Sequence, residues 1–146
     1  MTPTADRLAK ILAEIPQRLN AISDDDASYS SNPGHWSKKQ VLGHLIDSAS
    51  NNHQRFVRAQ LTASYEGPTY EQEKWVGAQA YAVESWSDLV SLWLFYNRHL
   101  LHIIRIVPEG PLAVPCTIAD SAPLPLAEVM SSYVDHLEHH LAQILG

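Results

Sequence analysis

Apolar side chains recur at helical spacing in four long segments of this chain. The segments span about residues 4–22, 37–62, 84–107 and 126–145. Within each segment the apolar residues stand three or four positions apart, which places them on one face of an α-helix. No stretch alternates convincingly between apolar and polar residues, apart from a short apolar piece at residues 112–118. The pattern therefore predicts an all-α fold.

Local signals set several helix boundaries. Ser37, followed three residues later by Gln40, forms a capping-box pattern and marks the start of the second helix. Pro16 should kink or shorten the first helix, and the acidic run at residues 23–34 predicts a loop. Five prolines at residues 108–125 exclude a helix there. They leave a long Pro-rich loop before the last helix, which either covers a site or is a poorly ordered crossover. Four such helices predict a four-helix bundle.

Composition narrows the class of protein. The chain has 146 residues and 45% hydrophobic content, which suits a single domain over residues 1–146. A net charge of -6 with scattered basic residues argues against a nucleic-acid partner. No uncharged apolar run reaches the roughly 18 residues of a membrane span. Cys116 is the only cysteine, so no intrachain disulfide forms, and we expect a reducing, cytoplasmic location.

The last segment carries a histidine pair that suits a metal ion. His136 and His140 lie one helical turn apart, at the edge of the apolar face and inside it, and a pair at this spacing can bind one ion. His139 points about 160° away from that face and should be exposed. A single histidine on an apolar face is more often a hydrogen-bonded core residue, so the pair requires a shared partner.

The third ligand is not decided by the residues alone. His44, His53, and either His99 or His102 are candidates on other predicted helices. On the helical wheel, His53 faces the core more squarely than His44. His44 instead begins a polar row along the flank of the second helix, and such a row is usually solvated.

Two stretches resemble the DinB/YfiT-like superfamily of small bacterial four-helix metal proteins. They are residues 36–56, with Gly43-His44-Leu45-Ile46-Asp47-Ser48, and residues 133–144, with His136-Leu137-Glu138-His139-His140. The resemblance covers most of the chain from Trp36 onward. It implies that His44, His136 and His140 bind a divalent metal. One departure is residues 113–116, Ala-Val-Pro-Cys, where YfiT-like members tend to carry a His-Pro motif.

Three neutral imidazoles favour a catalytic site, because they leave the ion its charge and at least one open position. Imidazole ligands suit zinc or nickel. The resemblance to bacillithiol- and mycothiol-dependent members implies a thiol-dependent S-transferase, with a low-molecular-weight thiol as cosubstrate and a small electrophile as substrate. A metal-dependent hydrolase is the alternative, since the ion also acidifies water. A non-catalytic, stress-related metal-binding dimer is the third interpretation.

Other polar side chains have weaker functional interpretations. Asp47, and less so Glu138, are candidates for a proton relay, although both suit a solvated surface equally well. Arg55 and Arg98 are candidates for binding an anionic small-molecule substrate, although a helix-flank arginine more often forms a surface ion pair. Trp75 is a candidate wall of the pocket or an ordinary core residue.

The third helix is too apolar to be half-solvated. It carries Trp86, Trp93, Phe95 and Tyr96. Members of the resembling family tend to dimerise through helices. We therefore expect a homodimer.

Overall fold

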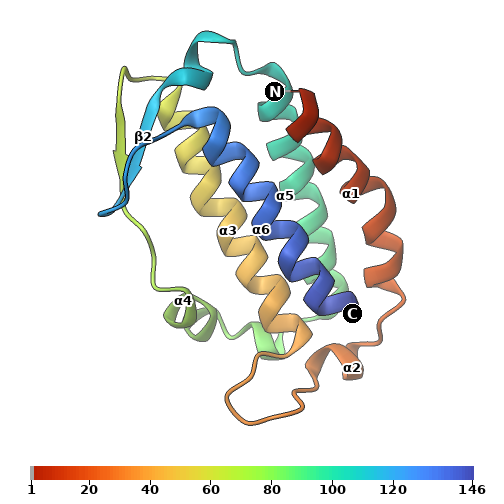
Figure 1. Cartoon of the computed structure of the whole chain (residues 1–146). Coiled ribbons are helices and arrows are strands. Elements are labelled where there is room, and N and C mark those ends of the chain that lie inside the picture. The colour runs from red at the N-terminus through yellow and green to blue at the C-terminus, as the bar shows by residue number, and fades with distance from the viewer. Residues whose placement is uncertain (1) are drawn as a thin grey trace.

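Four long helices build the fold, as the sequence predicts. The computed structural model describes residues 2–146. The long helices are α1 (Thr2–Asn20), α3 (Lys38–Ala59), α5 (Trp86–Ile106) and α6 (Leu126–Leu145). In the view of Figure 1, α1 and α6 run downward while α3 and α5 run upward. Helices α1 and α3 each contact both α5 and α6, so the four helices close into a bundle.

Helix α3 begins where the capping-box pattern predicts. The Ser37 hydroxyl accepts a hydrogen bond from the Gln40 backbone N–H at 3.3 Å, and the Gln40 side chain accepts one from the Ser37 N–H at 2.9 Å. These bonds satisfy two amides that the first helical turn leaves without partners. The start of the helix is therefore fixed, and with it the positions of His44 and Asp47 about two and three turns further on.

The structure bears on two local predictions near the N-terminus, and the one for the acidic run is wrong. Helix α1 continues through Pro16 and ends at Asn20, one turn after the proline. Leu19, in that last turn, is fully buried, so its packing favours the helix that Pro16 disfavours. The acidic run is not only a loop, because α2 (Asp24–Ser28) forms within it. Ser23 caps this helix, and aspartates fill its first turn, where the helix dipole favours negative charge.

The core lies between the four long helices. Its largest fully buried side chains are Trp93, Phe56, Leu8, Leu19, Leu42, Leu45, Leu89, Leu100, Ile104, Leu126, Met130 and Leu137. The outer side of α5 is not buried, since Leu92 and Phe95 are 45% and 62% exposed. Among residues 2–146, no helix joins enough length to enough apolar character to traverse a bilayer.

Two ordered connections flank α3 and α6. The crossover from α3 to α5 holds β1 (Tyr65–Gly67), α4 (Gln72–Gln79) and a 3₁₀ turn (Tyr81–Val83). The Pro-rich connection holds a second 3₁₀ turn (Gly110–Ala113), β2 (Pro115–Ile118) and β3 (Leu124–Pro125). Strand β2 pairs with β1 in parallel and with β3 antiparallel. The Pro-rich connection is thus ordered, and the crossover passes outside α3 on its way to α4 (Figure 1).

Candidate metal centre

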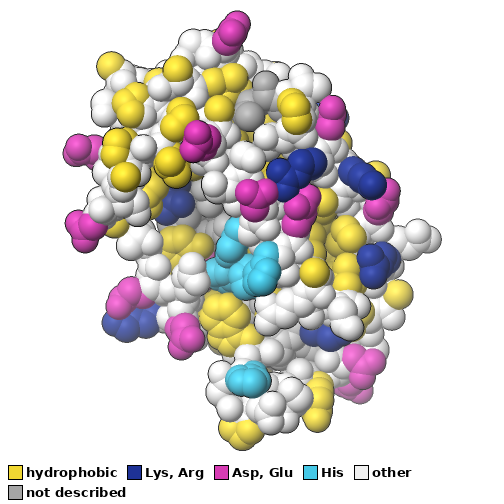
Figure 2. Space-filling model, in the orientation of Figure 1, with side chains coloured by type: hydrophobic (Ala, Val, Ile, Leu, Met, Phe, Trp, Pro, Cys, Tyr) yellow, Lys and Arg dark blue, Asp and Glu magenta, His cyan; other side chains and the backbone are white. Residues whose placement is uncertain are grey.

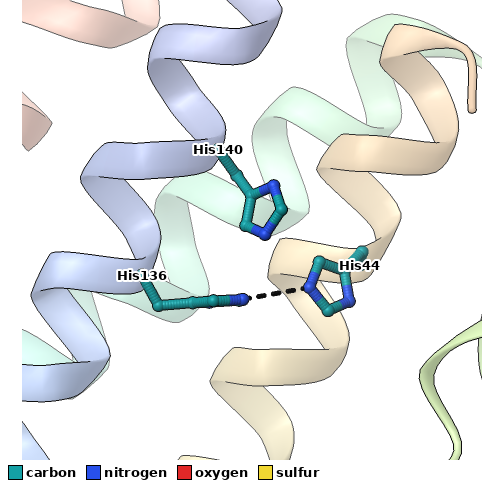
Figure 3. Close-up of side chains that lie close together, drawn as sticks. All are labelled: His44, His136 and His140. Atoms are coloured by element: carbon teal, nitrogen blue, oxygen red, sulfur yellow. Dashed lines mark hydrogen bonds between the residues drawn. The ribbon is translucent and has the colours of Figure 1, made fainter.

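Three histidine side chains converge on the seam between α3 and α6. His44 extends from α3, while His136 and His140 extend from successive turns of α6, and all point toward one another (Figure 3). Each offers one ring nitrogen, and these nitrogens lie within 4.8 Å of one another. The Nε2 atoms of His44 and His136 are 3.1 Å apart. Within residues 2–146, this is the one group of three or more potential ligands that gathers so closely.

The donor set fits a divalent ion. Two nitrogens that each bind an ion at about 2.1 Å lie roughly 3.0 to 3.4 Å apart. The spacing of His44 and His136 already falls in this range. The widest separation among the three nitrogens, 4.8 Å at most, exceeds this range by about 1.4 Å. The residues present therefore fit the metal that a three-histidine cluster implies.

Burial keeps two of the imidazoles neutral, the form that binds metal. His44 is 1% exposed, and its pKa is lowered from 6.5 to about 4, first by burial and then by the nearby His136 and His140. Burial, followed by the proximity of His140 and His139, lowers the pKa of His136 to about 4 as well. Neither ring therefore needs to lose a proton at neutral pH before it can bind an ion.

Neighbouring side chains orient the rings. His140 Nδ1 lies 2.9 Å from Gln143 Oε1, and His136 Nδ1 lies 3.5 Å from Ser48 Oγ. The Trp36 ring packs against His44 with 5.1 Å between centroids. His44 Nδ1 is buried and has no hydrogen-bond partner among the described residues. Because Gln143 Oε1 accepts, His140 Nδ1 carries the proton and its Nε2 keeps a lone pair for an ion.

The other histidines lie elsewhere. His53 is half buried on α3, where its Nδ1 is 2.9 Å from the Tyr96 hydroxyl and its ring packs on His99. The wheel therefore misjudged His53 and His44, because α6 and the crossover cover the side of α3 that holds His44. His99 and His102 are exposed on α5. His139 is also exposed, as predicted, and is not in the cluster.

Asp47 is not the solvated carboxylate that one interpretation allowed, since it is 2% exposed. Its Oδ1 accepts hydrogen bonds from the Tyr81 hydroxyl at 2.7 Å and from the Gln79 amide at 2.8 Å. Burial raises the pKa of Asp47, although these two hydrogen bonds oppose the rise. The carboxyl group thus ties the crossover to α3, three residues after His44. Glu138 lies on the surface, where it accepts from Arg7.

A cavity of about 270 Å³ opens beside the cluster. His136, Ser48 and Asn52 form part of its wall, together with Arg55 and Tyr70. Histidine side chains gather at the surface near the centre of the face in Figure 2, over α6 and α3. The cluster is therefore reachable from outside the bundle.

The predicted substrate-binding residues are only partly brought together. Arg55 and His136 line the same cavity. Trp75 is 38% exposed and packs on Tyr70, behind the cavity wall, with 5.3 Å between ring centroids. Arg98 is exposed on α5, where its guanidinium lies over the Phe95 ring. The structure does not bring Arg98 to the cluster.

Sequence reasoning missed three contacts of the site. Gln143 stands three residues after His140, a spacing that signals contact on a helix. Gln79 and Tyr81 come from the crossover, and no sequence pattern links them to Asp47. A weak signal for Tyr81 was Gly43, because a Cβ atom there would lie 2.1 Å from the Tyr81 ring.

Curated relatives cover most of the chain. A protein of Bacillus mycoides named as a candidate metal-dependent hydrolase is 27% identical over an alignment of 146 positions. The alignment covers 95% of this chain and 82% of the relative. One from Oceanobacillus iheyensis with the same description is 24% identical over 133 residues, covering 88% of this chain and 73% of the relative.

Solved structures share the fold. YfiT from Bacillus subtilis, described as a probable metal-dependent hydrolase with an unusual four-helix bundle topology, superposes with a TM-score of 0.73 and 21% identity. The match covers 96% of this chain and 83% of YfiT. A mycothiol-dependent maleylpyruvate isomerase superposes with a TM-score of 0.80 and 11% identity, covering 98% of this chain and 60% of the isomerase.

The family assignment follows from the sequence profile. The profile of the DinB superfamily matches residues 7–144, nearly the whole chain, and the match includes all three clustered histidines. This confirms the resemblance that residues 36–56 and 133–144 indicated. The chain belongs to the DinB superfamily.

Proposed function

We propose that this protein is a divalent-metal-dependent enzyme whose ion is held by His44, His136 and His140. The observation that carries the proposal is the convergence of three imidazoles from two helices, with their nitrogens within 4.8 Å. Zinc and nickel are the proposed metals, because both accept imidazole ligands. The names of the curated relatives, which refer to metal dependence, support the same class.

A divalent ion in such a site leaves a coordination position open and lowers the pKa of a thiol or water bound there. The chain supplies the rest of the site. His44 and His136 stay neutral through burial. Gln143 fixes the ring of His140. The cavity beside His136 holds the small-molecule substrate.

Transfer of a low-molecular-weight thiol to a small electrophile is the reaction we propose first. Within residues 2–146, no carboxylate forms a hydrogen bond to the three clustered histidines. The nearest one along α3, Asp47, accepts from Tyr81 and Gln79 on Oδ1, and its buried Oδ2 has no hydrogen-bond partner among the described residues. A free thiol has a pKa of about 8.5, whereas that of water is about 15.7, so a thiol needs far less help to lose its proton. The fold shared with a mycothiol-dependent isomerase also supports this choice.

Metal-dependent hydrolysis is the second candidate. It is favoured by the names of the relatives from Bacillus mycoides and Oceanobacillus iheyensis and by the description of YfiT. In this reaction water, rather than a thiol, is the nucleophile. Asp47, three residues after His44, is the candidate acid or base. A cytoplasmic location is part of the proposal, supported by the single cysteine.

Two assays separate these reactions. The first measures loss of free cysteine thiol with monochlorobimane, and the second measures hydrolysis of nitrophenyl acetate, each with the zinc-loaded and the metal-free protein. Transfer predicts metal-dependent thiol loss in the first assay, whereas hydrolysis predicts a response only in the second. His136→Ala should abolish whichever activity appears, while His139→Ala, a change on the exposed face, should retain it. If both assays are silent with metal bound, the non-catalytic dimer becomes the better interpretation.

A further inference from the structure

The cavity beside the three clustered histidines contains an arginine that forms no ion pair within residues 2–146. Arg55 is half buried in its wall. Its Nη1 lies 3.5 Å from Asn52 Oδ1 and its Nη2 lies 3.4 Å from the Pro68 carbonyl, both at the outer limit of a hydrogen bond. None of the ion pairs found within residues 2–146 involves Arg55. A half-buried guanidinium is normally paired, so this one is available for a ligand.

The rest of the cavity selects for one negative charge. No aspartate, glutamate or lysine side chain lines it, and the remaining polar groups, such as Tyr70 and Asn52, are neutral. Ile118, Leu124 and Val129 supply an apolar wall. The cavity is open to the outside, and its volume of about 270 Å³ has room for an occupant of roughly ten non-hydrogen atoms.

We infer that this cavity binds a small organic monocarboxylate, with its carboxylate on Arg55 and its apolar body against Ile118, Leu124 and Val129. The planar guanidinium matches a carboxylate through two parallel hydrogen bonds. A phosphate group would bring a second negative charge that one arginine leaves unpaired, at a cost in this half-buried setting. The inference deepens the proposed function and rests on it in one respect. His136, a proposed metal ligand, lies in the same wall, so the reactive end of the ligand would lie beside the ion.

Arg58 provides a matched control. It lies on the same helix, three residues after Arg55, and its Nε donates to the Gln54 side chain at 3.0 Å. It lines a separate cavity of about 310 Å³, which Arg55 also borders from the other side. A ligand that pairs with Arg55 in the cavity beside His136 should therefore be insensitive to Arg58, while a ligand in the separate cavity should depend on both.

Phenylacetate is the probe, with phenylacetamide as a neutral analogue of equal size and phenylphosphonate as the more highly charged alternative. Each is titrated into the zinc-loaded and the metal-free protein, with backbone amide chemical shifts as the readout. Metal-free protein isolates Arg55, because zinc itself attracts carboxylates. We expect phenylacetate to bind roughly ten-fold or more tightly than the amide, since a charged hydrogen bond is lost. The largest shifts should fall on Tyr70, Ile118 and Val129.

The variants decide the outcome. Arg55→Gln should abolish the preference for phenylacetate without changing zinc content, and Arg58→Gln should leave the preference intact. The inference would be overturned if phenylacetate and phenylacetamide bound with equal affinity, or if the preference for phenylacetate survived Arg55→Gln. Tighter binding of phenylphosphonate than of phenylacetate, or chemical shifts that do not saturate by about 10 mM phenylacetate, would overturn it as well. Carboxylate binding by a protein that takes up no zinc would contradict the proposed function alone, whereas zinc binding without carboxylate preference would contradict this inference alone.

Discussion

The Nε2 atoms of His44 and His136 lie 3.1 Å apart across the seam between α3 and α6. The two residues are 92 positions apart in the sequence, so their meeting depends on the packing of the whole bundle. Two neutral imidazole rings at this distance can share one hydrogen between their Nε2 atoms. A ring nitrogen of His140 lies within 4.8 Å of both other ligand atoms. A cation is the partner that satisfies all three nitrogens together.

His139 and His140 should differ sharply in their effect on metal content. His140 belongs to the cluster, whereas its neighbour is exposed and points outward. His140→Ala should lower the affinity for zinc by roughly 100-fold or more, because one of three ligands is lost, and His139→Ala should leave it unchanged. Elemental analysis after dialysis against a weak chelator measures both. Equal loss in the two variants would mean that the ligands are not those proposed.

The metal-free protein should lose stability as the pH falls from about 6.5 toward 4. His44 and His136 have pKa values lowered to about 4 in the folded state, so between these values the unfolded chain binds more protons. The loss should be on the order of 5 kcal/mol in total for the two residues. Urea melts at neutral and acidic pH measure it. The double variant His44→Gln, His136→Gln is the control, and an equally steep decline there would refute this origin.

Gly43 should tolerate no side chain. An added Cβ would lie 2.1 Å from the Tyr81 ring, which is buried and held by Asp47. Gly43→Ala should therefore cost about 2 kcal/mol or more and weaken zinc binding at the adjacent His44. Gly77→Ala is the matched control, because nothing lies within 4 Å of its Cβ position in α4. Chemical denaturation should show this second change to be neutral or slightly stabilising.

We propose that the protein is a homodimer. Trp86 and Trp93, two of the aromatic residues that suggested this, are 3% and 0% exposed and serve the core of the chain itself. The proposal now depends on the outer side of α5, where Leu92 and Phe95 remain 45% and 62% exposed. Light scattering at tens of micromolar should give twice the chain mass, and Phe95→Glu should reduce it to one. A monomeric wild-type protein would refute the proposal.

Sequence alone predicted the elements whose signals are local. Helix α6 spans Leu126–Leu145 as expected, because its apolar face is regular, and the same wheel placed His139 outside. The capping-box pattern at Ser37 located the start of α3. The acidic run was misjudged, because the Ser23 cap outweighed propensity, while packing of Leu19 carries α1 past Pro16.

The site was less accessible to sequence reasoning, because its neighbours are distant along the chain. The wheel ranked His53 above His44, since it takes no account of which elements cover a helix. Asp47 was judged partly on its spacing, yet its burial comes from Tyr81 and Gln79 in the crossover. Only the resemblance to a known family selected His44 beforehand, and the geometry of the folded chain now gives a physical reason for that choice.

Anomalous diffraction from crystals soaked in zinc or nickel chloride locates the ion itself. We predict one strong peak about 2.0 to 2.2 Å from a ring nitrogen of each of His44, His136 and His140, with at least one further coordination position open toward the cavity lined by Arg55. A strong peak elsewhere, for example between His53 and His99, with none at the three clustered histidines, would contradict it.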